Sequence, residues 1–280
     1  MARRPSIRTS LGAVAATIAL LAVSFAGGTG AQAAPPPPPS IAALGDSITQ
    51  ATDACGYRDC PAYSWSTGSS SSVKSHASRL RLAGATTLAV YNDAVTGSKA
   101  ANLLAQAQKA VAQRAQYVTV EIGANDACTS TVAGMTATAA FRTSVLTALQ
   151  AINQGTPTAR IFVASIPNLK RMWSLSQAKS GARLVWAAGK ICQSMLVRPT
   201  STAIADTTRR DQVQARVDEY NVALAGACAA VANCTFDGNA VANYSFTASQ
   251  ISVLDYFHPS ISGQAKFAEI TWGVSPYGTP

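Results

Sequence analysis

The sequence is short of histidine and has no concentrated block of positive charge. Only two of its 280 residues are His, and such a shortage argues against a metal site, since zinc sites draw on His together with Cys. The Lys and Arg residues are scattered, and no nucleic-acid-binding motif is present. We therefore expect no nucleic-acid partner, no metal ion and no organic cofactor.

Long apolar runs are also missing, with one exception at the N-terminus. Residues 11–26 are mostly apolar, three arginines precede them, and Ala-Gln-Ala follows at 31–33. A basic start, an apolar run and a small-x-small site are typical of a secretory signal peptide, which we expect over residues 1–33. No later run is long enough to predict a membrane span. We therefore expect a secreted, extracellular protein.

After the leader, the sequence predicts a short spacer and one domain. The proline run within residues 34–40 favours a stiff, extended chain, which we interpret as a spacer. Residues 41–280 suit one α/β domain with a sizeable core. Removing the three arginines of the leader lowers the net charge from +9 to +6. A basic surface can attract anionic partners, so we expect transient contact with anionic lipid surfaces and a monomeric chain.

The cysteine count is even, which in an exported chain indicates disulfides. Two pairs are close enough in sequence to close single loops, Cys55–Cys60 and Cys228–Cys234. The remaining pair is Cys128–Cys192. We therefore predict three disulfides in these pairings.

Apolar segments alternate with segments of helical pattern along the chain. We predict strands over residues 41–44, 86–91, 117–122 and 161–166, with a short fifth strand starting at 235. We predict helices over residues 73–82, 99–114, 132–153, 207–232 and 261–272. Strands that alternate with helices indicate βαβ units and a parallel sheet. Residues 51–72 form a long loop, and long loops in compact domains are usually functional.

A candidate nucleophile follows the first predicted strand. Gly45-Asp46-Ser47 interrupts the apolar run, and a glycine at this point allows a sharp turn. Ser47 would then lie at the carboxyl end of a strand, where open α/β sheets bind ligands. A serine hydroxyl is a poor nucleophile at neutral pH and needs a base, most often His.

The choice of base is between two histidines. His76 lies in a polar helical segment, and we expect it to be exposed to solvent. His258 lies in Asp255-Tyr256-Phe257-His258, so one turn can bring the Asp255 carboxylate to the imidazole. A carboxylate in that position fixes the tautomer and stabilises the imidazolium. An Asp-x-x-His segment can also be a simple loop cap, which remains the alternative.

Acyl transfer further requires donors for an oxyanion. The backbone N–H of Ser47 is one candidate, and Gly97, after the second predicted strand, offers another. The Asn125 side chain, after the third predicted strand, is a third. Taken singly, Gly97 and Asn125 could equally be turn residues.

Together these segments resemble the four blocks of the SGNH, or GDSL-type, hydrolases. The blocks are Gly45-Asp46-Ser47, the Gly97 segment, Gly123-Ala124-Asn125-Asp126, and Asp255-Tyr256-Phe257-His258. The resemblance implies a three-layer α/β/α sandwich with a flavodoxin-like parallel sheet. It also implies that Ser47 is the nucleophile, His258 the base and Asp255 its orienting partner. Ser47, Gly97 and Asn125 would form the oxyanion hole.

Further stretches are similar to secreted bacterial lipases and esterases of the phospholipase B-like branch. They include Ser64-Trp65-Ser66-Thr67-Gly68 and Phe257-His258-Pro259-Ser260. This resemblance implies hydrolysis of carboxylic ester bonds of lipids through an acyl-enzyme intermediate. The alternatives are a carbohydrate or cell-wall O-deacetylase that uses the same residues, and a non-catalytic binding domain. Residues 168–206 match nothing in the branch and are a candidate lining of the acyl pocket.

Overall fold

The apolar run near residue 41 forms the first strand, and all six of its residues are buried. Burial along the whole strand is typical of a parallel sheet whose two faces are both covered by helices. The computed structural model describes residues 1–3 and 35–278 of the chain. Its strands are β1 (Ser40–Gly45), β2 (Ala89–Asn92), β3 (Tyr117–Glu121), β4 (Arg160–Val163) and β5 (Cys234–Phe236).

The strands form one sheet in the order β2-β1-β3-β4-β5, and every neighbouring pair is parallel. This is the flavodoxin-like order, which confirms the predicted fold class. The direction of the chain across the sheet reverses between β1 and β3. The carboxyl ends of these two strands therefore border the crevice in which such sheets bind ligands.

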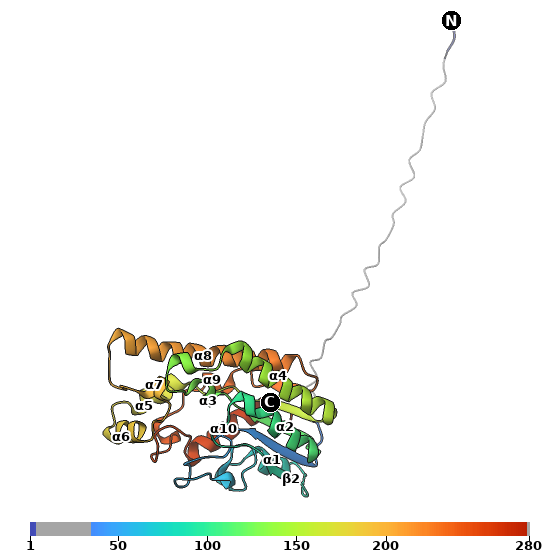
Figure 1. Ribbon diagram of the computed structural model, residues 1–280. Coiled ribbons are helices and arrows are strands. Elements are labelled where there is room, and N and C mark those ends of the chain that lie inside the picture. Colours follow the sequence, from blue (N-terminus) through green and yellow to red (C-terminus); the bar gives the residue numbers. More distant parts are fainter. Residues whose placement is uncertain (4–34, 279–280) are drawn as a thin grey trace. The chain divides into compact units, whose positions relative to one another are not determined.

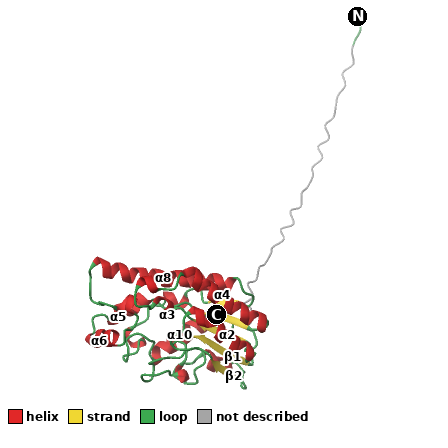
Figure 2. Cartoon of the chain, viewed as in Figure 1, coloured by secondary structure: helices red, strands yellow, loops and turns green. Residues whose placement is uncertain are grey.

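Helices cover both faces of the sheet (Figures 1 and 2). On one face α2, α4 and α8 pack side by side, and α1 and α10 lie on the other. The helices are α1 (His76–Leu82), α2 (Leu103–Ala112), α3 (Ala124–Ala127), α4 (Thr138–Gly155), α5 (Leu169–Ser176), α6 (Ser180–Ala188), α7 (Gln193–Leu196), α8 (Ile204–Ala229), α9 (Ala240–Asn243) and α10 (Ile261–Gly273). Short 3₁₀ turns lie at Pro61–Tyr63, Ala100–Asn102, Val132–Gly134 and Ala248–Gln250.

The predicted elements are present, but several of their ends differ. The fourth strand stops at Val163. Ala164 N–H still donates to the Val120 carbonyl of β3, but the two N–H groups after it bond to side chains outside the strand ladder. Ser165 N–H donates to Asp237 and Ile166 N–H donates to Asn221. The helix predicted from residue 207 begins earlier, at Ile204. These differences leave the order of elements unchanged.

The N-terminal predictions meet the described residues only in part. The signal peptide predicted over residues 1–33 lies almost entirely outside them and stays a prediction. In the predicted spacer, Pro38 is buried and the Pro39 carbonyl accepts a hydrogen bond from Ala89 N–H, so the spacer's end contacts the domain. Within the described ranges, no helix has both the length and the apolar character that a bilayer crossing requires.

The expectation that His76 is exposed is wrong. Its side chain is fully buried, with Nδ1 2.9 Å from the Tyr117 hydroxyl and Nε2 2.8 Å from Thr271 Oγ1. Burial lowers the pKa of His76 to about 3, with a smaller contribution from Arg79. The residues around His76 are polar, so their pattern did not indicate that this side chain of α1 points into the core. His76 is a neutral core residue that joins α1, β3 and α10.

All three predicted disulfides are present, and none of the described cysteines is free. Cys55–Cys60 closes a turn in the loop after β1. Cys228–Cys234 joins the end of α8 to β5. Cys128–Cys192 links the segment after α3 to the start of α7, 64 residues away in sequence.

Candidate active site

The site lies at the carboxyl edge of the sheet, where β1, β2 and β3 end. Ser47 follows β1, Gly97 follows β2 and Asn125 follows β3. Gly45 makes the turn after β1 possible, because its φ is +144° and a Cβ there would lie 2.1 Å from the Glu121 carbonyl oxygen. The sheet therefore gathers three segments that are far apart in sequence.

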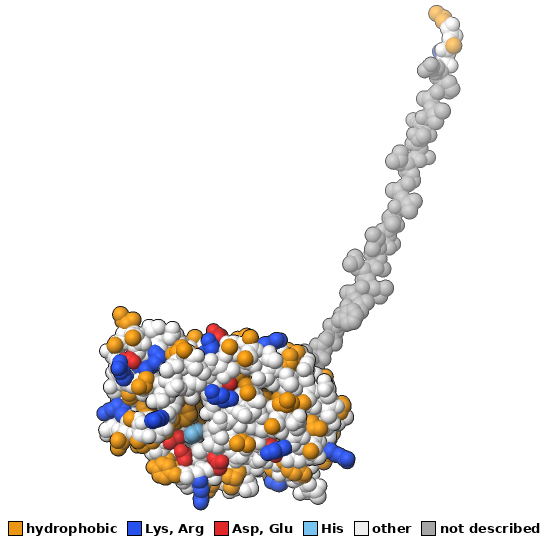
Figure 3. Space-filling view, in the orientation of Figure 1, with side chains coloured by type: hydrophobic (Ala, Val, Ile, Leu, Met, Phe, Trp, Pro, Cys, Tyr) orange, Lys and Arg blue, Asp and Glu red, His pale blue; other side chains and the backbone are white. Residues whose placement is uncertain are grey.

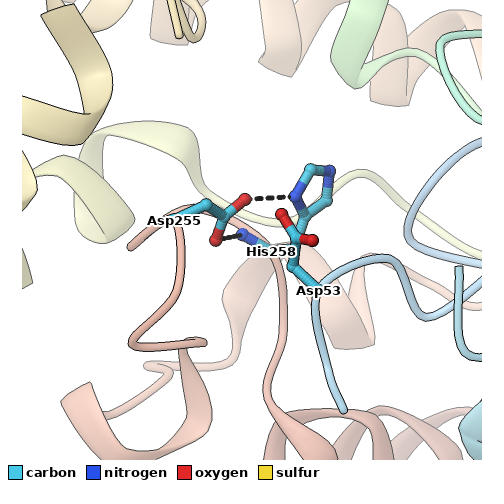
Figure 4. Close-up of side chains that lie close together, drawn as sticks. All are labelled: Asp53, Asp255 and His258. Carbon is cyan, nitrogen blue, oxygen red and sulfur yellow. Dashed lines mark hydrogen bonds and ion pairs between the residues drawn. The ribbon is translucent and has the colours of Figure 1, made fainter. Parts of the chain in front are cut away.

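A chain of hydrogen bonds runs from Ser47 through His258 to Asp255. Ser47 Oγ lies 2.8 Å from His258 Nε2, and His258 Nδ1 bonds to Asp255 Oδ2 (Figure 4). The other Asp255 oxygen accepts the backbone N–H groups of Phe257 and His258, at 2.9 and 3.1 Å. Because Asp255 accepts the Nδ1 proton, the neutral imidazole has its lone pair on Nε2, facing the serine hydroxyl.

The groups around the His258 imidazole favour its acceptance of a proton. Burial alone would lower the pKa of His258, but the hydrogen bond and charge of Asp255 outweigh it and raise the pKa. For Asp255, burial acts to raise the pKa, but the contacts with His258 and two backbone N–H groups lower it. Asp255 thus stays ionised beside the imidazole, where a carboxylate would stabilise an imidazolium at His258.

Two backbone donors at the site are available to a ligand. Among the described residues, neither the Ser47 N–H nor the Gly97 N–H has a hydrogen-bond acceptor. Gly97 has φ +83°, a conformation that L side chains rarely adopt. Unpaired N–H groups beside a nucleophile are the donors that an oxyanion requires.

The Asn125 side chain is the third predicted donor, and it already has partners. Its Nδ2 donates to the Ser98 carbonyl at 3.0 Å and to Asp46 Oδ2 at 3.3 Å. The bond to Asp46 is the longer and weaker of the two. An oxyanion beside Ser47 would compete with Asp46 for that hydrogen.

Asp53 is a site residue that the sequence analysis missed. Its carboxylate lies beside the imidazole, with ligand atoms of Asp53, Asp255 and His258 all within 4.8 Å of one another (Figure 4). Partial burial, followed by the negative charge of Asp255, raises the pKa of Asp53. Both nitrogens of His258 are engaged with Asp255 and Ser47, so this group serves the hydrogen-bond chain. No spacing rule marks Asp53, since it comes from a loop about 200 residues away from Asp255 along the chain.

The imidazole also borders an apolar pocket. The space in the pocket that no atom fills is about 460 Å³, part of it open to solvent. Of residues 168–206, Asn168, Leu169 and Met172 lie in its wall and the others do not. The pocket is lined by Ile48, Ala124, Pro167, Asn168, Leu169, Met172, Phe246, Ile251, Phe257, His258 and Pro259. Figure 3 shows a histidine side chain on the surface, flanked by acidic side chains.

Solved structures share this fold. An extracellular lipase from Streptomyces rimosus has a TM-score of 0.52 and 19% identity, over 84% of this chain and 99% of the lipase. Phospholipase A1 from Streptomyces albidoflavus has a TM-score of 0.53 and 15% identity, over 85% of this chain and 100% of that one. A family two carbohydrate esterase from Clostridium thermocellum has a TM-score of 0.50 and 17% identity, over 85% of this chain and 63% of the esterase.

Identities this low establish a common fold and nothing finer. A search of curated proteins finds no significant match. A family model, in contrast, matches residues 43–266, a range that contains every residue of the hydrogen-bond chain and all three predicted oxyanion donors. The chain therefore belongs to the GDSL-like lipase/acylhydrolase family.

Proposed function

We propose that the protein is a secreted serine esterase that hydrolyses carboxylic ester bonds of lipids through an acyl-enzyme intermediate. The observation that carries the proposal is the Ser47–His258–Asp255 chain beside an apolar pocket. Family membership supports ester hydrolysis. The predicted leader and the three disulfides support export, since disulfides persist in oxidising compartments.

In the first half of the reaction, Ser47 Oγ attacks the ester carbonyl while His258 Nε2 takes its proton. The carbonyl oxygen becomes an anion, for which the N–H groups of Ser47 and Gly97 and the Asn125 amide are donors. His258 then gives its proton to the leaving alcohol oxygen, and the carbon–oxygen bond to that alcohol breaks. Asp255 remains ionised throughout.

In the second half, a water molecule replaces the alcohol. His258 accepts a proton from the water as its oxygen attacks the acyl carbon, and the bond to Ser47 Oγ breaks. Ser47 regains its proton from His258, and the fatty acid leaves. The chemistry uses only residues of the chain and water.

The pocket wall supports an acyl chain rather than an acetyl group. Its lining is almost entirely apolar, and burying an acyl chain there gains roughly 0.8 kcal/mol per methylene group. A carbohydrate or cell-wall O-deacetylase is the second candidate, supported by the shared fold of the carbohydrate esterase. A deacetylase would need no deep apolar wall beyond its acetyl-binding position.

Hydrolysis of p-nitrophenyl esters from C2 to C16 separates these candidates. We expect kcat/KM to rise with chain length over the range that the pocket accommodates. Activity on the C2 ester alone would support deacetylation, and no activity on any ester would support a non-catalytic binding domain. Leu169→Trp, which narrows the pocket, should lower kcat/KM for long esters while C2 hydrolysis stays near the wild-type rate.

A further inference from the structure

Glu121 ends β3 directly behind the site and is fully buried. It pairs with Gly45 in the register of the sheet, one residue before Asp46. Among the described residues, no N–H or O–H donor is bonded to either of its carboxyl oxygens. The Asp46 carboxyl is close enough to act on it, since the negative charge of Asp46 raises the pKa of Glu121. A hydrogen bond between two carboxyl groups requires a proton on one of them.

The surrounding donors indicate which carboxyl holds the proton. Asp46 already accepts the Ile48 N–H at 2.9 Å and the Asn125 amide at 3.3 Å, and such bonds stabilise a carboxylate. Glu121 accepts neither. Burial, followed by the charges of Asp46 and Asp237, raises the pKa of Glu121 well above its ordinary value. Burial raises the pKa of Asp46 only to about 6. These surroundings favour a protonated Glu121 and an ionised Asp46 at neutral pH.

Other charged groups act on this pair from neighbouring elements. Asp237, after β5, accepts hydrogen bonds from Ser165 N–H and Oγ, at 3.0 and 2.7 Å. Asp126 raises the pKa of Asp46 and His258 lowers it. A second negative charge at Glu121 would therefore be added to a region that already contains several acids, so the neutral form of Glu121 is strongly favoured.

We propose that Glu121 is a positioning residue for the ester hydrolysis described above: as a neutral acid it donates to Asp46 and so holds the carboxylate that orients the Asn125 amide. Its proton also keeps a second anion away from the place where the oxyanion forms. The inference rests on the proposed function for its kinetic consequence. It goes beyond that function by assigning a role to a residue outside the hydrogen-bond chain.

Two variants of Glu121 test the donor role. Glu121→Gln keeps a donor of the same length, and we expect turnover within about threefold of wild type. Glu121→Leu keeps the bulk and removes the donor, and we expect kcat to fall roughly ten- to a hundredfold with KM nearly unchanged, because Asn125 is misplaced. Both are assayed well below their melting temperatures, so that the loss reflects the site rather than unfolding.

The pH profile gives a readout that a purely structural role would not change. Wild-type kcat should fall at alkaline pH as Glu121 loses its proton, whereas Glu121→Gln has no proton to lose there and should keep its activity. The decrease in kcat at acid pH, which is set by His258 and Asp46, should be the same in the wild type and Glu121→Gln. This comparison stands even where Glu121→Leu does not fold.

Three kinetic results would overturn the proposal: wild-type turnover in Glu121→Leu, equal losses in both variants, or an alkaline decrease in kcat that is the same in Glu121→Gln as in the wild type. If the wild-type protein hydrolyses no ester, it is the proposed function that fails. The infrared carbonyl band of a neutral carboxyl, present in the wild type and absent in Glu121→Gln, then still tests the proton. Absence of that band from the wild type would also overturn the proposal.

Discussion

Among single residues, Ser47 and His258 are expected to act together, since their side chains share a hydrogen bond of 2.8 Å. Ser47→Ala and His258→Ala should each lower kcat roughly a thousandfold or more, because the nucleophile and its base act as one unit. The double variant should be no slower than either single one. Exposed Ser71→Ala is the matched control and should keep full activity. A double variant far slower than both single variants would contradict the shared role, as would activity in Ser47→Ala.

Asn125 allows a finer test at the same scale. Losing one oxyanion donor costs on the order of 3 kcal/mol of transition-state stabilisation, roughly a hundredfold in turnover. Asn125→Ala should therefore lower kcat and leave KM nearly unchanged, since the neutral carbonyl needs the donor less. Asn125→Asp should be slower still, because its carboxylate would repel the oxyanion. A raised KM with normal kcat would instead mark Asn125 as a substrate-binding residue.

At the scale of elements, the bridge Cys128–Cys192 ties the segment behind Asn125 to α7. Ser194 reinforces this link, since its N–H donates to the Thr129 carbonyl at 2.8 Å and its hydroxyl to the Ala127 carbonyl at 2.7 Å. These bonds remain when the disulfide is removed. Without the disulfide, the segment behind Asn125 should therefore become more mobile, while the remaining hydrogen bonds keep the domain folded.

Cys128→Ala/Cys192→Ala should accordingly lose activity at a urea concentration below its unfolding midpoint. Activity and circular dichroism are measured across a urea series in the variant and the wild type. The result is the difference between the urea concentration at which activity is lost and the one at which the domain unfolds. Cys228→Ala/Cys234→Ala is the control, because that bridge lies at the amino end of β5, away from the site. We expect its activity and structure to be lost together. If both variants lost activity and structure at the same urea concentration, the Cys128–Cys192 bridge would have no special link to the site.

At the scale of the whole molecule, the buried His76 makes stability depend on pH. The pKa of His76 falls from 6.5 to about 3 on folding, so between these values the unfolded chain binds a proton that the folded chain does not. The contribution of His76 to stability is therefore full above about pH 6.5 and is lost as pH falls toward 3. His76→Gln should be less stable at pH 7, because it alters the bonds to Tyr117 and Thr271. It should, however, lose less stability than the wild type between pH 7 and pH 4.

Urea unfolding at both pH values measures the difference. Glu121 and Asp46 have raised pKa values, so their contributions are lost as pH rises, and they act equally in both proteins. If the free energy of unfolding changed equally with pH in the wild type and His76→Gln, His76 would not be a source of the acid sensitivity.

The order of elements was predictable because it depends on local pattern. Apolar runs such as β1, helical periodicity and the even cysteine count are properties of neighbouring residues. A common edge of the sheet could be predicted for Ser47, Gly97 and Asn125, because each of them follows one of three successive strands. The ends of elements were less predictable, as at Val163, because Asp237, just after β5, and Asn221 of α8 accept the N–H groups of Ser165 and Ile166.

The sequence by itself determined the parallel α/β fold class, the disulfide pairings and the identity of the candidate nucleophile and base, since each depends on residue type, order or spacing. Only the tertiary structure decided that His76 is buried, that Asp53 lies beside His258 and that the Glu121 carboxyl is buried without a donor. The physical reason is that burial and the pKa of a side chain depend on every group around it. Those groups come from distant parts of the chain, and only folding brings them together.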